Sequence, residues 1–166
     1  HELRNMMYWA LDHTDGPVVI RYPRGRGSKI DYKNKLEKLV VPSSRMLTIG
    51  QNIAVLSIGQ IGIEVQKAIA NNNLESKVSH IDARCMKPLD LKALSETFRR
   101  FEKIITVEES CLIGGFGGHV ARVLGGELDV ADRMGRSVPI SGIGPGYVLA
   151  TVENTPKHNA IGASFL

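Results

Sequence analysis

The sequence predicts an α/β fold of three layers, an αβα arrangement with a mostly parallel sheet and one antiparallel edge strand. The apolar, β-branched run at residues 104–107 is typical of a strand buried on both faces of a parallel sheet. From Phe116 the apolar spacing becomes helical, at Phe116, Val120, Val123 and Leu124. Strand-like and helix-like runs also alternate between residues 53 and 124, which is the pattern of βαβ units with helices on both faces.

Residues 1–27 are predicted to end a preceding domain. Apolar residues at helical spacing predict an amphipathic helix that begins almost at residue 1, with Leu3, Met6, Met7, Ala10 and Leu11 on one face. The Asp-Gly-Pro sequence at 15–17 breaks this helix, and residues 18–22 are predicted to form a strand that Pro23 closes. Because one helix and one strand cannot form a core alone, we expect them to belong to another domain.

Residues 28–44 form a polar, lysine-rich run without a clean period, which predicts an interdomain linker that crosses a surface. The second domain is predicted to cover residues 45–166. Two strand-like runs open it, at 45–50 and 53–58, and the short glycine-containing connection between them predicts an antiparallel hairpin.

The next elements follow in βαβ order. A helical apolar spacing begins at Ile61 and is stopped by the three asparagines at 71–73. Residues 78–83 are predicted to form a strand, and Asp90 is expected to cap the following helix. The apolar face of that helix carries Leu91, Leu94, Phe98 and Phe101.

The change from strand to helix at residues 108–118 marks the carboxyl edge of the sheet, where ligands usually bind. Glu108 and Glu109 are adjacent on a strand end, so they face opposite ways and cannot form one acid–base pair. One of them is expected to accept hydrogen bonds from the helix start. The Gly114–Gly118 cluster could hold an anion, but Val120 stands where a G-x-G-x-x-G motif has its third glycine, so close helix–strand packing is favoured.

Composition excludes several classes of protein. The 166 residues are 43% hydrophobic and 23% charged, as expected for a globular chain with one full core. The net charge of +4 is modest and scattered, so no nucleic acid is expected as a partner. No apolar run approaches about 18 residues, so no membrane interaction is expected either. Two cysteines without metal-ligand spacing favour a reducing, cytosolic setting, and His119 has no second ligand nearby.

Three strings, in this order, resemble the C-terminal part of the 1-deoxy-D-xylulose-5-phosphate synthase family. They are IRYPRGRG at 20–27, DARCMKPLD at 82–90, and TVEE at 106–109 followed by GGFG at 114–117. The resemblance implies a transketolase-type, thiamine-diphosphate-dependent transferase that condenses pyruvate with glyceraldehyde 3-phosphate and releases CO2, on the route to isoprenoids, thiamine and pyridoxal. It further implies a cytoplasmic enzyme, or a plastid enzyme in a plant or alga.

The same resemblance assigns the parts of the chain. Residues 1–27 would end the pyrimidine-binding domain, and residues 45–166 would form a transketolase C-terminal domain. A family strand falls at 139–144, and the sequence after about residue 144 is atypical or truncated. Thiamine diphosphate and Mg²⁺ would be bound in the full-length enzyme, whereas none is expected on this fragment, which is predicted to be inactive alone. The implied partners are the remainder of the enzyme and a second copy in a homodimer.

Arg24 and Arg26 are the predicted substrate-binding residues, and no catalytic, cofactor-binding or metal-binding residue is assigned. From spacing alone, the Arg-Gly-Arg-Gly run at 24–27 is more simply a solvated loop. The resemblance places Arg24 at the phosphate of glyceraldehyde 3-phosphate, and a guanidinium can grip two phosphate oxygens. Arg26 is the second candidate. The alternative functions are the β subunit of a 2-oxoacid dehydrogenase and a non-catalytic dimerisation module.

Overall fold

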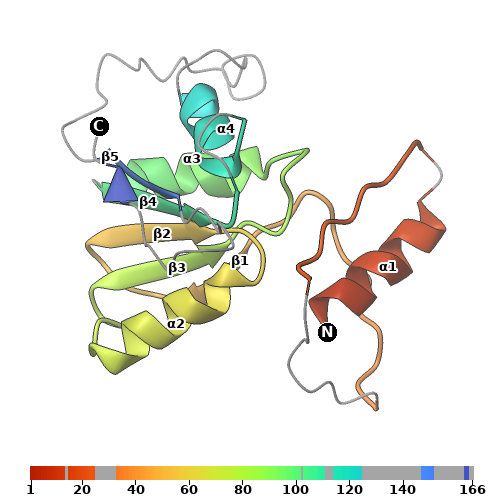
Figure 1. Ribbon diagram of the computed structural model, residues 1–166, viewed down its shortest axis with the longest axis horizontal. Helices are drawn as coiled ribbons and strands as arrows, with labels where there is room; N and C mark the ends of the chain where they lie inside the picture. The colour runs from red at the N-terminus through yellow and green to blue at the C-terminus, as the bar shows by residue number, and fades with distance from the viewer. Residues whose placement is uncertain are drawn as a thin grey trace.

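The computed structural model describes residues 1–13, 15–24, 33–101, 103–110, 114–124, 147–151 and 163–164. Within these ranges six strands form one sheet, and they are β1 (Arg45–Thr48), β2 (Ile53–Ser57), β3 (Val78–Asp82), β4 (Lys103–Glu108), β5 (Tyr147–Thr151) and β6 (Ala163–Ser164). Their order across the sheet is β1-β3-β2-β4-β5-β6 (Figure 1). Strands β3, β2, β4 and β5 are parallel, and the edge strands β1 and β6 are antiparallel to β3 and β5.

Helices cover both faces of this sheet, which confirms the predicted three-layer fold. The helices are α1 (Glu2–Asp12), α2 (Ile61–Asn71), α3 (Leu91–Arg100) and α4 (Phe116–Leu124). Helix α2 packs on one face, around Val55, Ile69 and Val78, while α3 and α4 pack on the other. The second core contains Ala54, Leu56, Ile81, Ala83, Leu89, Leu94, Phe101, Ile104, Phe116, Val120 and Val123. Val55 and its neighbour Leu56 therefore serve opposite faces, as the pleat of a strand requires.

The predicted hairpin between the first two strands is wrong. Strand β1 pairs with β3, and β2 lies between β3 and β4. The connection between β1 and β2 crosses the start of β3, where the Gly50 N–H donates to Ser79 Oγ and the Ser79 hydroxyl donates to the Gly50 carbonyl, each at 2.9 Å. A Cβ at Gly50 would overlap the backbone of Val78. The glycine serves this close approach and not a tight hairpin turn.

The structure differs from the predictions in two further places, one strand that was expected and one that was not. Residues 18–22 were expected to be a strand, but they pair with no strand in the described part of the chain, and Val19 is 91% exposed. A strand needs a hydrogen-bonding neighbour, and this segment lies apart from the sheet beside α1 (Figure 1). Strand β5 was not predicted, and it adds to β4 with Ile104 opposite Tyr147. The family strand expected at 139–144 lies outside the described residues.

Glu108 joins β4 to α4 from inside the protein. Its side chain is buried, and its two carboxylate oxygens accept hydrogen bonds from the N–H groups of Phe116 at 2.7 Å and Gly117 at 2.8 Å. The expectation that one of the two glutamates bonds to the helix start is confirmed. Gly114 has a φ of +79° with nothing near its missing Cβ, so a left-handed turn, and not close packing, requires that glycine.

A second buried polar pair lies under α2. Ser57 Oγ and His80 Nε2 are 2.8 Å apart on the neighbouring strands β2 and β3, and both residues are fully buried. A Cβ at Gly62 would lie 2.7 Å from Ser57 Oγ, so the helix can approach the pair only because residue 62 is glycine. His80 Nδ1 has no hydrogen-bond partner among the described residues. Burial lowers the pKa of His80, although the nearby Asp82 carboxylate partly opposes this.

Replacing Glu108 by Gln should destabilise the fold by about 1–3 kcal/mol. The NH2 group of glutamine cannot accept a hydrogen bond, so one of the two helix N–H groups would lose its acceptor. Glu109→Gln is the matched control and should change stability by less than about 0.5 kcal/mol, since only the carbonyl of Glu109 accepts a described hydrogen bond. Urea unfolding followed by circular dichroism measures both. Equal losses in the two variants would show that the buried carboxylate has no special role.

The chain should lose stability as the pH falls from about 7 to 5. The pKa of His80 is lowered in the folded state from its ordinary 6.5, so the unfolded chain binds the proton first and protonation favours unfolding. The slope from this one group is at most about 1.4 kcal/mol per pH unit. His80→Gln should be less stable at pH 7 but should show a flatter pH dependence. A variant with the same pH slope as the parent chain would rule out His80 as the titrating group.

Candidate functional site

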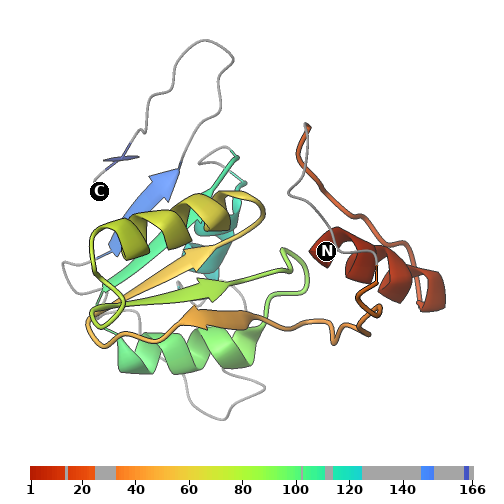
Figure 2. The same ribbon diagram turned by 90° about the horizontal axis from the view of Figure 1, so that it is seen from below.

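The candidate site lies at the carboxyl edge of the sheet, where β2, β3 and β4 end. Main-chain hydrogen bonds hold these ends together, from Ala83 N to Ser57 O at 2.8 Å and from Ile58 N to Val107 O at 3.2 Å. Figure 2 shows α1 and the segment that follows it on the side to which β2 and β3 point. The edge therefore faces the N-terminal part of the chain, which carries the predicted substrate residue Arg24.

Arg21 attaches this N-terminal part to the edge. Its guanidinium donates a 2.7 Å hydrogen bond to the main-chain carbonyl of Glu109, the residue after β4. Three residues later, Arg24 is exposed and so available to a ligand. The structure thus places Arg24 in a segment that is attached to the carboxyl edge, whereas Arg26 lies outside the described residues.

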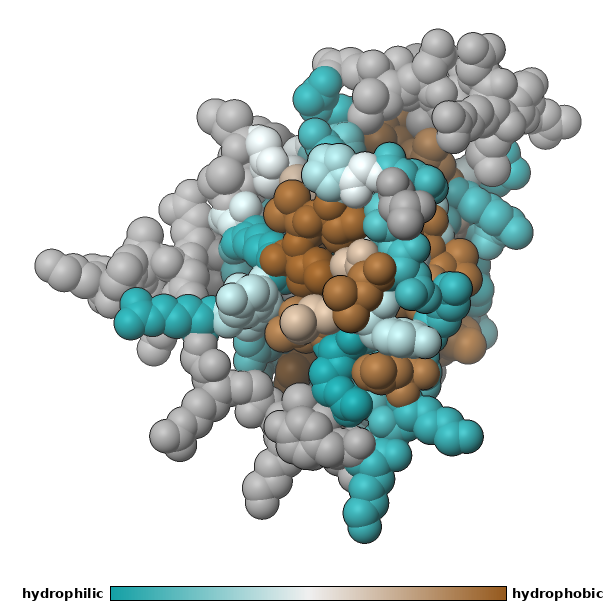
Figure 3. Space-filling model, turned by 90° about the vertical axis from the view of Figure 1, so that its right-hand side faces the viewer, coloured by the Kyte–Doolittle hydropathy of each residue, from teal (hydrophilic) through white to brown (hydrophobic). Residues whose placement is uncertain are grey.

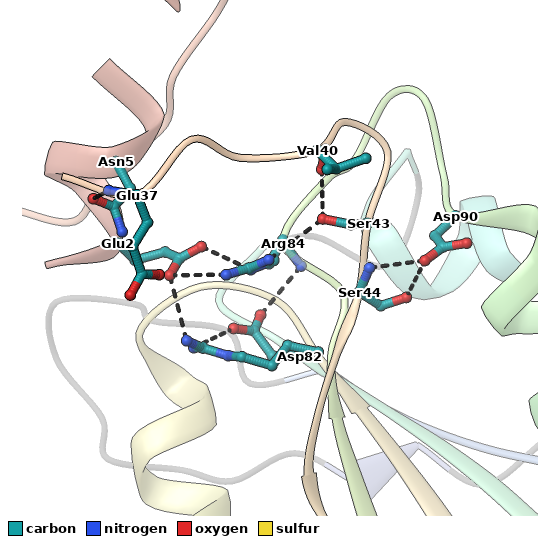
Figure 4. A network of polar contacts seen from close by, with 10 residues as sticks. Glu2, Asn5, Glu37, Val40, Ser43, Ser44, Asp82, Arg84 and Asp90 are labelled. Atoms are coloured by element: carbon teal, nitrogen blue, oxygen red, sulfur yellow. Dashed lines mark hydrogen bonds and ion pairs between the residues drawn. The ribbon is translucent and has the colours of Figure 1, made fainter. Parts of the chain in front are cut away.

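A network of four charged side chains lies at the end of β3 (Figure 4). Glu2 of α1 contacts two arginines, with its Oε1 at 2.7 Å from Arg84 Nε and its Oε2 at 3.4 Å from Arg45 Nη1. Asp82 contacts the same two residues, with Oδ2 at 3.0 Å from Arg45 Nη2 and Oδ1 accepting from the Arg84 N–H at 3.1 Å. Ser43 Oγ accepts a further 3.3 Å bond from Arg84. Two positive and two negative charges therefore balance.

The predicted role of Asp90 as the N-cap of α3 is confirmed. The same side chain also binds Ser44, in the segment before β1. Its Oδ1 accepts from the Ala93 N–H at 3.1 Å, and its Oδ2 accepts from the main-chain N–H and the hydroxyl of Ser44, at 2.8 and 2.6 Å. Burial by itself would raise the pKa of Asp90, but the hydrogen bonds from Ser44 and Ala93 outweigh it, so the pKa lies below its ordinary value. The carboxylate stays ionised at neutral pH.

The anion position considered at the glycine-rich helix start is already filled. The two N–H groups that would bind an anion there, of Phe116 and Gly117, donate to the buried carboxylate of Glu108. His119 lies in the next turn, and its pKa is lowered by burial and by the positive charges of Lys87 and Arg122. The hydrogen bonds at the helix start therefore have a structural role, since they connect the end of β4 to α4.

Ser57 and His80 resemble a nucleophile and its base in distance alone. Both are fully buried beneath α2, so no substrate reaches them, and they are a polar pair of the core.

Across the described residues, no three His, Cys, Asp or Glu side chains converge closely enough to hold a metal ion. In the same ranges no helix is long and apolar enough to cross a membrane.

Sequence reasoning missed Glu2, Arg45, Asp82 and Arg84 as a group. Asp82 and Arg84 belong to a string that carried the family resemblance, but nothing in the spacing linked them to Glu2, which lies 82 residues before Arg84. The available signal was the opposite charge of Asp82 and Arg84, which lie two residues apart at the end of a predicted strand.

Comparison with known proteins identifies relatives for most of the chain. The family model for the C-terminal domain of transketolase matches residues 43–143. The 1-deoxy-D-xylulose-5-phosphate synthase of Phocaeicola vulgatus is 43% identical over 122 residues, covering 72% of this chain and 19% of the relative. That of Bacteroides thetaiotaomicron is 46% identical over the same shares, and that of Porphyromonas gingivalis is 43% identical over 151 residues, covering 89% and 24%. The chain thus spans about a fifth of the length of these relatives.

A solved structure supports the fold. The chain superposes on a split gene transketolase, described as an inactive β4 tetramer, with a TM-score of 0.52 and 21% sequence identity. The match covers 74% of this chain and 36% of that one. Because the family model matches more than half of the chain and the three-layer architecture agrees with this neighbour, the chain belongs to the family of transketolase C-terminal domains.

Proposed function

We propose that the chain is the C-terminal part of a 1-deoxy-D-xylulose-5-phosphate synthase, which condenses pyruvate with glyceraldehyde 3-phosphate and releases CO2. The three curated relatives described above, which carry this name, are 43–46% identical to the chain over 72–89% of its length. This similarity carries the assignment of the enzyme. The hydrogen bond from Arg21 to the Glu109 carbonyl supports a substrate role for Arg24, because it attaches the segment of Arg24 to the edge where ligands meet parallel sheets.

In this proposal Arg24 binds the phosphate of the aldehyde substrate. A guanidinium presents a planar fork of N–H donors that matches two phosphate oxygens and stays charged at every relevant pH. Pro23 fixes the backbone just before it. The exposure of Arg24 supports this role, since its donors are not enclosed by the described part of the chain. Arg26 is proposed as a second phosphate contact.

Thiamine diphosphate would supply the carbanion chemistry of the reaction. We propose that other parts of the longer protein bind this cofactor and its Mg²⁺. We propose that this chain contributes a substrate contact and packing surfaces, and that it has no activity alone. The proposed division is residues 1–27 as the end of the pyrimidine-binding domain, 28–44 as the linker and 45–166 as the C-terminal domain.

The proposed partners are the remainder of the enzyme and a second copy of it. Apolar surface gathers on the side of the molecule that carries α1 (Figure 3). Several large apolar side chains of the N-terminal part are exposed, namely Leu3, Met7, Tyr8, Leu11, Val19, Tyr22, Leu36 and Val40. The side chain of Leu11, for example, is 84% exposed. Surface of this kind commonly marks a protein–protein contact, which supports burial against the rest of a larger protein.

Arg24→Ala, made in the longer protein that contains the upstream region, should raise the KM for glyceraldehyde 3-phosphate about 10- to 150-fold, because a charge-assisted phosphate contact contributes roughly 1.5–3 kcal/mol. The KM for pyruvate, which has no phosphate, should change little. Arg99→Ala, an exposed arginine on α3, is the matched control and should leave both constants unchanged. If Arg24→Ala affected both substrates equally, or neither, the phosphate assignment would be wrong.

A further inference from the structure

Arg84 has a backbone conformation that its residue type disfavours. Its φ is +55°, in the left-handed region that costs a residue with a side chain of order 1 kcal/mol and costs glycine almost nothing. The turn is held by the 3.1 Å bond from the Arg84 N–H to Asp82 Oδ1. A glycine would satisfy this backbone equally well, so the strain indicates that the arginine side chain has a role of its own.

That side chain is directed at the N-terminal part of the chain. It is only 15% exposed, and Figure 4 shows it between Glu2 on one side and Ser43 on the other. Its Nε lies 2.7 Å from Glu2 Oε1 as an ion pair, and its Nη2 donates to Glu2 Oε2 at 3.3 Å. Arg45 approaches the same Glu2 oxygen while it is held by Asp82. The end of β3 and the start of β1 thus present two positive charges, of Arg84 and Arg45, to one carboxylate of α1.

The N-terminal part of the chain, residues 1–13 and 15–24, is therefore attached to the carboxyl edge at two points. Glu2, at its start, contacts Arg84 just after β3, and Arg21, near its end, donates to the Glu109 carbonyl just after β4. A buried side chain of α1, Asn5, adds a 3.1 Å bond from the Glu37 N–H. Fixing both ends of the segment restricts where Arg24, three residues beyond Arg21, can lie.

We propose that Arg84 is a positioning residue: through Glu2 it holds α1 and the segment after it against the carboxyl edge, and so fixes the place of Arg24. The attachment itself is independent of the enzyme's identity, and only its kinetic consequence rests on the proposed function. The pair is partly enclosed and shares its carboxylate with a second arginine, so solvent screens it less than an isolated surface ion pair.

Hydrogen–deuterium exchange on the 166-residue chain tests the attachment with a double-mutant cycle. Glu2→Gln and Arg84→Gln should each speed amide exchange in residues 2–12 and 17–24 about 5- to 10-fold, while the amides of β2, β3 and β4 stay protected. Because the two residues act through each other, the double variant should fall well short of the product of the single effects. Glu96→Gln and Arg99→Gln, both exposed on α3, are the matched controls and should change nothing.

Arg84→Gly separates the side chain from the turn. It relieves the left-handed strain and removes the guanidinium, so the N-terminal segment should loosen as in Arg84→Gln although the sheet stays intact. Unchanged exchange in residues 2–24, or single effects that simply multiply, would overturn the proposal.

A kinetic readout in the longer protein separates this inference from the assignment of Arg24. Arg84→Gln should raise the KM for glyceraldehyde 3-phosphate about 3- to 10-fold and leave the KM for pyruvate unchanged, with Arg84→Lys in between. If Arg24→Ala has the expected effect and Arg84→Gln has none, the positioning role is overturned. If Arg24→Ala has no effect while the exchange cycle shows coupling, the attachment stands and the phosphate assignment fails.

Discussion

The ends of parallel strands bring polar groups together at one edge of the sheet, and the rest of this structure depends on how those groups are satisfied. Three carboxylates do this in the same way. Glu108 accepts from the start of α4, Asp82 accepts from the Arg84 N–H, and Asp90 accepts from the first turn of α3. Each side chain fixes the first residues of the segment that follows it, since buried N–H groups must find acceptors.

This fixed edge gives the N-terminal part of the chain a surface to bind. The contacts made there are charged, with Glu2 and Arg21 as the two points of attachment, while the outer face of α1 remains apolar and exposed. The chemistry of the two faces differs because they meet different neighbours. Charged contacts fix direction and register against the edge, and the apolar face suits burial against the proposed remainder of the enzyme.

Local patterns predicted the elements well and their pairing poorly. Helical spacing located α1, α2, α3 and α4, and the sequence rules for capping identified Asp90 and one of the paired glutamates. The hairpin prediction was wrong because strand pairing is decided by contacts distant in sequence, here the close approach of Gly50 to Val78. A run of β-branched residues at 18–22 has strand propensity, but propensity does not form a strand without a partner.

The candidate site was predicted only in part for the same reason. A motif resemblance pointed to Arg24, whereas the ion pair of Glu2 with Arg84 joins residues 82 positions apart and leaves no periodic signal. The left-handed conformation of Arg84 was likewise not predicted, because an arginine in the sequence gives no sign of a positive φ. Tertiary structure was needed to show that these charges meet.

Release of CO2 from labelled pyruvate by the longer protein, measured with and without glyceraldehyde 3-phosphate, tests the proposed function most directly. The proposed function predicts release that depends on the aldehyde phosphate, with one CO2 released for each aldehyde phosphate consumed. Release that ignores the aldehyde phosphate and requires a lipoyl acceptor would instead indicate a 2-oxoacid dehydrogenase subunit and would contradict the proposal.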